Sequence, residues 1–288
     1  MKFRTIFILF NIVIIVSFLF VFLLPFFLLG AEYSLGFWKG NWYLALFFLA
    51  LIAALNAFFL FNRKVFTLVE SEDWGALSAH LVDLIFVQHK YRPTHIRLLV
   101  NAYLLQSNVE GIERLEAELA AKKPALLRSN ALLFGVTRLL RNRPAEAEAF
   151  FAKYLEAREV QTRDWLRFDY AFSLVLQRRI ADAVPILREG ALSRDAVLSL
   201  LSAYLLGSLG AASLSEQEGR AELVAFAEAA RARLTKRFGG PRWSREVDRA
   251  KNEVHIVILS KLIDDAGAWL FAGADKTAST TSSGSPGK

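Results

Sequence analysis

Two long apolar stretches lie near the start of the chain, and a pattern with helical period follows them. Residues 5–30 and 41–62 contain no charged side chain, and each stretch reaches the roughly 20 residues that a helix needs to cross a bilayer. Only a short segment with Glu32 and Lys39 separates them, and it predicts a loop. The pattern therefore predicts a transmembrane hairpin over residues 1–62, made of two antiparallel helices.

The positive charges that flank the two stretches predict the orientation of this hairpin. Lys2 and Arg4 precede the first stretch, Arg63 and Lys64 follow the second, and only Lys39 lies between them. Because lysine and arginine favour the cytoplasmic side, we expect the N-terminus, the following domain and the C-terminus to be cytoplasmic, in a bacterial inner membrane. The alternatives are a hairpin of the opposite orientation and a cleaved signal peptide with Lys2 and Arg4 as its basic region.

Few polar residues interrupt the two apolar stretches. Asn11 and Asn56 should reach a similar depth in an antiparallel pair, where their amides would hydrogen-bond across the helices. The alternative is that both lie near the interface and meet water. Neither stretch holds an ionisable side chain, which disfavours a transporter or pump built from this hairpin alone.

After Lys64 the chain has the pattern of successive amphipathic helices without any strand-like alternation, so we predict an all-α domain. The segment Ala102–Leu105 recurs as Ala203–Leu206, which is 101 residues later and close to three periods of 34. Small or apolar residues also recur at intervals of 35, 35 and 36, at Leu77, Ile112, Ala147 and Ala183. This regularity indicates an internal helical repeat.

Pairs of small residues twelve apart strengthen the case for a repeat, as in Gly135 with Ala147 and Ala171 with Ala183. In this spacing the chain resembles the tetratricopeptide repeat (TPR) family, in which each unit is a pair of antiparallel helices, A and B. The resemblance implies a TPR-like α-solenoid in which small residues let neighbouring helices approach closely. Another kind of α-solenoid is the alternative.

The predicted repeat domain extends over residues 63–272. Its first helix A, residues 61–71, would continue the second apolar helix directly, and residues 73–89 would be its helix B. The alternative is a flexible elbow at residues 62–64. Gly239-Gly240-Pro241 precedes an amphipathic helix over about Arg242–Phe271, which should cap the domain.

The last residues, 273–288, are rich in Ser, Thr and Gly and lack large apolar side chains. Such a composition does not support a packed core, so we expect a disordered tail.

Composition argues against most catalytic chemistry. The absence of cysteine excludes disulfides, thiolate metal sites and cysteine nucleophiles. The four histidines do not share a helical face at the spacing of metal ligands, and no phosphate-binding glycine loop or nucleophile elbow is present. We therefore expect no enzyme activity, no catalytic residues, no metal and no cofactor.

A groove lined by the A helices would bind proteins, as the TPR resemblance implies. Arg97 and Asn101 lie four residues apart and resemble the first element of the clamp with which some TPR domains hold a partner's terminal carboxylate. Trp165, Phe168 and Phe172 would line an apolar part of the groove for a partner helix. Their alternative role is core packing.

The segment 231–251 concentrates positive charge. It has a net charge of +6, because eight basic side chains stand against Glu246 and Asp248. The basic residues are Arg231, Arg233, Lys236, Arg237, Arg242, Arg245, Arg249 and Lys251. Such a patch suits anionic lipid or an acidic partner, and a solvated face is the alternative. Because the segment has no known nucleic-acid-binding motif, we do not expect nucleic acid as a partner.

Together these patterns predict a membrane-tethered scaffold or adaptor that binds partner proteins at the membrane surface. Two alternatives stay open. One is a structural subunit of an envelope machine of the flagellar or secretion type. The other is an accessory subunit of a membrane enzyme or transporter, with its partner bound to the hairpin.

Overall fold

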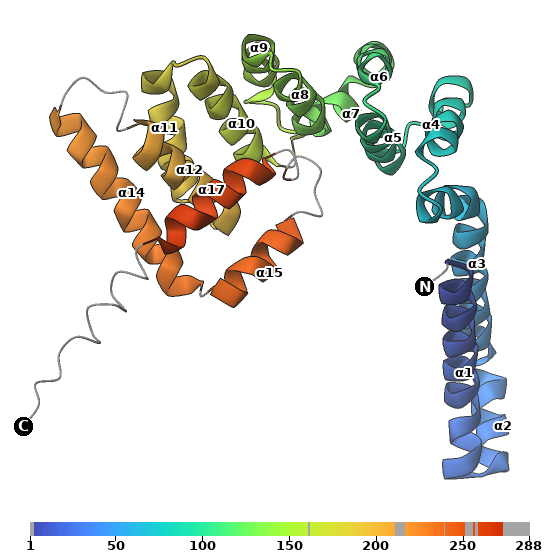
Figure 1. Cartoon of the computed structure of the whole chain (residues 1–288). Helices are drawn as coiled ribbons and strands as arrows, with labels where there is room; N and C mark the ends of the chain where they lie inside the picture. The colour runs from blue at the N-terminus through green and yellow to red at the C-terminus, as the bar shows by residue number, and fades with distance from the viewer. Residues whose placement is uncertain are drawn as a thin grey trace, which may run out of the picture. The chain divides into compact units, whose positions relative to one another are not determined.

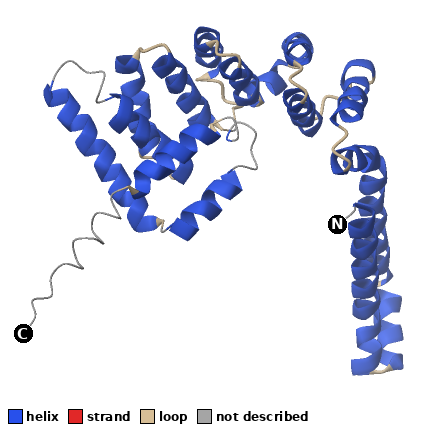
Figure 2. Cartoon of the chain, viewed as in Figure 1, coloured by secondary structure: helices blue, strands red, loops and turns tan. Residues whose placement is uncertain are grey.

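The computed structural model describes residues 3–272, except for residues 161, 211–216, 239, 251–255 and 257–258. Over these residues the chain forms helices joined by turns and loops, and none of them lies in a strand (Figure 2). The all-α prediction is thus confirmed for the described residues. The chain divides into two compact units, Met1–Tyr91 and Arg92–Lys288.

Two long helices, α1 (Phe3–Leu29) and α3 (Trp42–Glu70), dominate the first unit (Figure 1). They run antiparallel, because Phe10 contacts Phe59 at a ring-centroid distance of 5.5 Å while Phe18 contacts Phe48 at 6.0 Å. Both are long and apolar enough to cross a membrane, and their most apolar windows contain no buried residue. They are therefore candidate membrane-spanning helices, as the sequence predicts.

The predicted loop between these helices is instead a third helix, α2 (Ala31–Gly40). The chain reverses at Gly30, whose φ of +82° lies in the region that favours glycine. Trp38 then stacks on Phe22 of α1, with ring centroids 3.8 Å apart and an interplanar angle of 9°. The loop prediction is wrong. After the bend at Gly30, α2 packs against the end of α1, and the Trp38–Phe22 contact lies between the two helices.

The second half of α3 continues past Asn62 to Glu70 without a break, as expected for a helix that leaves the apolar stretch directly. After a turn, α4 (Trp74–Val82) and the π-helical segment η1 (Asp83–Val87) follow, and α4 packs back on α3. Leu77, Leu81 and Ile85 are fully buried there. The first unit therefore contains a helical hairpin beyond the apolar stretches, and it ends at Tyr91 rather than at residue 62.

The second unit begins with helical hairpins that pack side by side (Figure 1). Their first helices, α5, α8, α10 and α12, contact one another in this order, and the intervening helices α6, α9 and α11 pack against them. The helices are α5 (Pro93–Leu105), α6 (Val109–Lys122), α7 (Pro124–Ser129), α8 (Ala131–Leu140), α9 (Pro144–Tyr154), α10 (Arg163–Leu176), α11 (Ile180–Ala191), α12 (Ala196–Leu205) and the π-helical η2 (Leu206–Gly210).

One backbone turn recurs along both units. A residue with φ between 53° and 62° links the two helices of each hairpin, at Glu72, Ser107, Asn142 and Arg178, which are 35, 35 and 36 residues apart. The residue after each donates its N–H to a carbonyl five residues back, in the pairs Asp73–Leu68, Asn108–Tyr103, Arg143–Arg138 and Arg179–Leu174. This arrangement satisfies carbonyls at the end of the first helix. The turn thus recurs at the spacing that the sequence predicts.

Close packing at small residues joins the hairpin helices. A Cβ atom added to Gly135 in α8 would lie 2.1 Å from Cε1 of Phe151 in α9. One added to Gly111 in α6 would lie 2.7 Å from Cζ of Tyr103 in α5. Ala147, Ala171 and Ala183 are fully buried. Small side chains therefore stand where the helices approach most closely.

Three helices close the described chain: α14 (Gln217–Arg237), α15 (Gly240–Ala250) and α17 (Ser260–Phe271). The prediction of one capping helix over 242–271 is wrong, since α17 starts after a turn at Leu259. The division lets both α15 and α17 pack against α12. The predicted tail, 273–288, lies outside the described residues.

Candidate functional site

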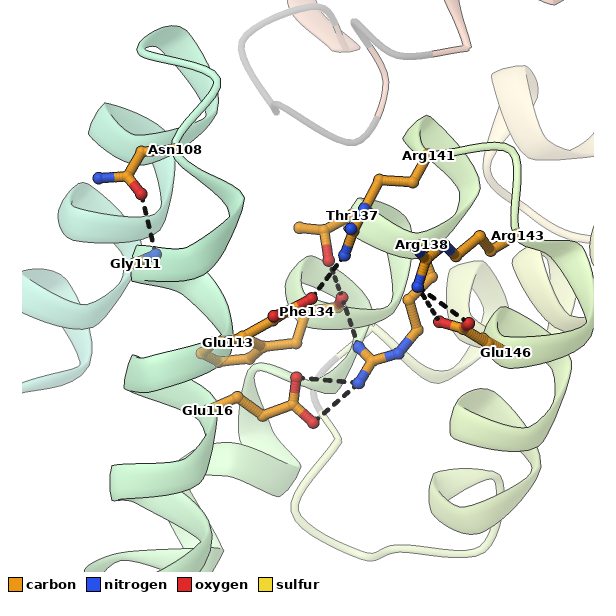
Figure 3. Close-up of polar contacts among 10 residues, drawn as sticks. All are labelled: Asn108, Gly111, Glu113, Glu116, Phe134, Thr137, Arg138, Arg141, Arg143 and Glu146. Carbon is orange, nitrogen blue, oxygen red and sulfur yellow. Dashed lines mark hydrogen bonds and ion pairs between the residues drawn. The ribbon is translucent and has the colours of Figure 1, made fainter.

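Charged side chains connect successive hairpins at their exposed ends (Figure 3). Arg138 of α8 binds both carboxylate oxygens of Glu116 in α6, at 2.9 and 3.0 Å, and Arg141 binds Glu113 one turn away. At the next junction Gln177 donates to Glu148 at 2.8 Å. Gln177 and Glu148 occupy the positions of Arg141 and Glu113 one repeat later in the sequence. We call these inter-hairpin bonds the polar seam.

A cavity of about 250 Å³ opens along the polar seam between α6, α8 and α9, and a larger one of about 500 Å³ lies between α10, α11 and the start of α12. In the smaller cavity the charges of Glu113, Glu116, Arg138 and Arg141 are already paired. In the larger one Arg167 pairs with Glu189. Because exposed pairs of this kind contribute at most about 1 kcal/mol each, the seam orients the hairpins more than it stabilises them.

The structure places Arg97 and Asn101 together on α5, as the sequence predicts. Arg97 donates through Nε to Oδ1 of Asn130 at 3.2 Å, which ties α5 to the start of α8. The Oδ1 atom of Asn101 is buried and has no hydrogen-bond partner among the described residues. The pair therefore combines a structural arginine with an asparagine whose oxygen is unsatisfied.

The aromatic residues of the predicted groove lie on α10 and do not form an open surface. Trp165 and Phe168 are only 8% and 2% exposed, and Trp165 donates its Nε1 hydrogen to Asp195 at 2.9 Å. Phe172 is partly exposed and stacks on Phe168 at 6.2 Å. The open-groove prediction thus fails for Trp165 and Phe168, which pack in the core, although Phe168 also borders the 500 Å³ cavity.

A buried acid on the same helix has no counterpart among the sequence predictions. Both carboxylate oxygens of Asp169 are buried without a hydrogen-bond partner in the described part of the chain. Burial raises the pKa of this carboxyl well above its ordinary value, so the neutral acid is favoured in the folded protein. No spacing or motif marks Asp169, because its environment depends on which face of α10 is covered.

A row of exposed leucines follows the repeat. Leu105, Leu140 and Leu176 are 61%, 50% and 44% exposed, and each is the last residue of its helix. They are 35 and 36 residues apart, and α5, α8 and α10, which carry them, pack in sequence. We call them the leucine row. Sequence reasoning missed it, although its spacing equals that of the recurring residues Ile112, Ala147 and Ala183.

Asn11 and Asn56 lie at matching levels of α1 and α3, since Phe10 and Phe59 are in contact beside them. Asn11 donates its Nδ2 hydrogen to the Phe7 carbonyl at 2.9 Å, and Asn56 donates to the Ile52 carbonyl at 3.0 Å. Each amide is therefore bonded within its own helix, instead of across the helices as the pairing prediction has it.

The predicted basic patch separates into two groups. In the first group, guanidinium groups on α14 donate to carbonyls that follow or end other helices. These bonds are Arg231 Nε to Leu270 O at 3.2 Å, Arg233 Nη2 to Ala191 O at 2.7 Å, and Arg237 Nη1 to Arg194 O at 3.5 Å. Such arginines hold the closing helices in place, because helix C-termini present unsatisfied carbonyls.

In the second group, Lys236, Arg242, Arg245 and Arg249 are exposed on the end of α14 and on α15. Among the residues that the structure describes, none of these four has a carboxylate within ion-pair distance. Lys251, the last member of the predicted patch, lies outside the described residues.

The helices and surfaces define an all-helical protein with two candidate membrane-spanning helices. The chain belongs to the family described as "Uncharacterised Treponema protein", whose family model matches residues 111–272. A relative from Treponema pallidum (strain Nichols), described as an uncharacterized protein, is 30% identical over 232 residues, which cover 78% of this chain and 74% of the relative. No solved structure matches the chain.

Proposed function

We propose that the chain is a membrane-tethered scaffold of TPR type, in which an α-solenoid binds partner proteins and performs no catalysis. The observation that supports this most directly is the recurring turn at Glu72, Ser107, Asn142 and Arg178, with its repeated backbone hydrogen bonds. A regular succession of hairpins builds an extended surface from equivalent positions, which suits the binding of other proteins.

The membrane tether in this proposal is the pair α1 and α3. Their apolar side chains are exposed along windows long enough to span a bilayer, and lipid is the environment that suits such a surface. The Lys/Arg distribution around them favours a cytoplasmic repeat domain.

The leucine row is the binding surface we propose for a partner. Its three side chains occupy equivalent repeat positions, and two of the arginines that follow them are paired with acids, Arg141 with Glu113 and Arg179 with Glu148. Exposed apolar groups in neutral surroundings suit the apolar face of a protein segment better than a charged ligand.

Site-specific photocrosslinking in native membranes tests this proposal. The photoreactive residue p-benzoylphenylalanine replaces Leu105, Leu140 or Leu176 in the full-length chain, with Leu192 as the matched control because it is 60% exposed but outside the leucine row. We expect all three row positions to crosslink to the same protein and the control position not to.

Two results would count against a scaffold that binds through the leucine row. If position 192 gave the same crosslinks as the three row positions, the leucine row would not be the specific binding surface. Crosslinks exclusively between copies of the chain would favour the structural subunit of an assembly instead. In a further check, Leu140→Ser with Leu176→Ser should lower the yield of the partner crosslink from position 105 at least fivefold.

A further inference from the structure

The surface of α15 presents positive charge on one face. At about 100° per residue, Arg242, Arg245 and Arg249 lie within one stripe, because they are three and four residues apart. Glu246 borders this stripe one turn after Arg242, so positive charge is in excess there but does not stand alone. Trp243 and Val247 lie on the opposite face and are each 7% exposed. Trp243 contacts Phe238 edge-to-face at 6.2 Å, so the buried face fixes which way the arginines point.

Within the described chain these charges form no ion pair, although Arg245 donates through Nε to the Pro241 carbonyl at 3.3 Å. Lys236 and the three arginines are exposed, and no carboxylate of the described chain pairs with them. Several other exposed arginines of the second unit are held by acids, as Arg179 is by Glu148 and Asp182. Exposed cations without an ion pair on α15 and at the end of α14 therefore suit an anionic ligand outside the chain.

The rest of the surface narrows the choice of ligand. Over residues 231–250 none of the described large apolar side chains is exposed, since Leu234, Phe238, Trp243 and Val247 are all buried. A protein interface would place apolar or aromatic side chains at its centre, and a single-stranded nucleic acid would need aromatic rings to stack on. Cations without such anchors suit the phosphates of lipid headgroups.

We propose that Lys236, Arg242, Arg245 and Arg249 bind anionic phospholipid headgroups of the membrane in which the chain is held. The inference rests on the membrane tether of the proposed function, because tethering supplies a high local concentration of headgroups to a weak site.

Fluorescence quenching in lipid nanodiscs tests the inference with the full-length chain. Because the chain contains no cysteine, Ser244→Cys on the exposed surface of α15 gives one labelling site. Nanodiscs contain either phosphatidylcholine alone or a mixture with phosphatidylglycerol, and both carry a lipid with a spin-labelled headgroup as quencher. We expect quenching at least twofold stronger in the anionic discs, and its loss in high salt.

The triple variant Arg242→Gln, Arg245→Gln and Arg249→Gln should abolish the difference between the two discs. Its matched control is Lys153→Gln, Arg158→Gln and Arg194→Gln, which removes the same charge from other exposed positions and should keep the difference. Thermal unfolding followed by circular dichroism establishes that both variants are folded. The single variant Arg245→Glu should weaken the quenching in the anionic discs on its own.

Equal quenching in the two kinds of disc would overturn the inference, as would a triple variant that behaves like the unmodified chain. An α15 surface that crosslinks to an acidic protein in membranes but does not respond to lipid charge would overturn it in favour of that protein. A chain that fails to enter the discs would instead contradict the membrane tether, so the two failures are distinguishable.

Discussion

The long helices of the first unit and the hairpins of the second unit use the same apolar residues in opposite ways. Phe20 and Phe27 of α1 are 64% and 82% exposed, whereas Phe134 and Phe151 of the α8–α9 hairpin are fully buried. Burial of apolar area from water contributes about 25 cal/mol per Å², which the hairpins gain among themselves and α1 does not. The hairpins therefore bury their apolar side chains among themselves, whereas α1 and α3 expose theirs, as candidate membrane-spanning helices do.

Polar side chains differ between the regions in the same sense. Asn11 and Asn56 donate amide hydrogens to carbonyls of their own helices, so these bonds need no partner on the other helix. In the second unit Arg138 reaches across to Glu116 and remains partly exposed to water. A long helix whose polar side chains bond within the helix is suited to lipid. The hairpins, in contrast, bond part of their polar side chains to neighbouring hairpins.

The largest expected effect comes from placing charge on α1. The double variant Val16→Arg and Phe20→Arg changes two exposed residues near the middle of the helix. If lipid surrounds them, each arginine costs about 2.5–3.5 kcal/mol, and the variant should fail to integrate. The fraction of protein that resists carbonate extraction from membranes measures this.

Leu105→Arg is the control for the double variant, because Leu105 is as exposed as Phe20 but lies in the second unit. It should leave integration unchanged. Normal integration of the double variant would mean that α1 does not lie in the hydrocarbon, and the difference between the two regions would need another explanation.

A smaller effect is expected from one methyl group in the α8–α9 hairpin. Gly135→Ala would bring a Cβ atom to 2.1 Å from the ring of Phe151, and overpacking of this kind costs about 1–3 kcal/mol. Gly75→Ala is the matched control, since its Cβ would meet nothing closer than 3.7 Å. Thermal unfolding should show a lower Tm for the first variant and an equal or higher Tm for the second.

The smallest expected effect is a gain of stability from Asp169→Asn. In the folded chain burial raises the pKa of Asp169 well above its ordinary value of 3.8, so the folded protein holds this proton to higher pH than the unfolded chain does. Stability therefore falls as the pH rises above about 4. Asparagine has the same shape without the charge, so we expect a gain on the order of 1 kcal/mol at pH 7 and none at pH 3.5.

The difference in Tm between Asp169→Asn and the unmodified chain, followed from pH 3.5 to 7, isolates this ionisation from all other titrating groups. A variant that is less stable at pH 7 would mean that the carboxylate is charged and held by a partner in the folded protein.

The parts of the fold that follow from local pattern were predictable from the sequence. Charge-free apolar stretches identify α1 and α3 because lipid requires unbroken apolarity, and recurring small residues give the period of the hairpins because close helix contacts require them. The continuation of α3 past Asn62 was predictable for a similar reason, since no Gly or Pro interrupts it before Asp73.

Features that depend on contacts distant in sequence were not predictable. The loop predicted between the spans is α2 because Trp38 stacks on Phe22, and a single-sequence pattern does not show that contact. Trp165 and Phe168 are buried because other helices cover them, and Asp169 gives no sequence signal for the same reason. In the basic patch, the sequence does not distinguish Arg233, which binds a carbonyl of another helix, from Arg245, which does not. That difference depends on where the carbonyls of the other helices lie.

The recurring turn also bears on how a chain of this kind changes length during evolution. Ser107 and Asn142 have the same left-handed backbone conformation and the same hydrogen bonds after them. A deletion of residues 108–142 would join α5 to α9 through a turn of unchanged geometry, and a duplication would add one hairpin in the same way. Each hairpin is thus a module that recombination can remove or copy without creating a new kind of junction.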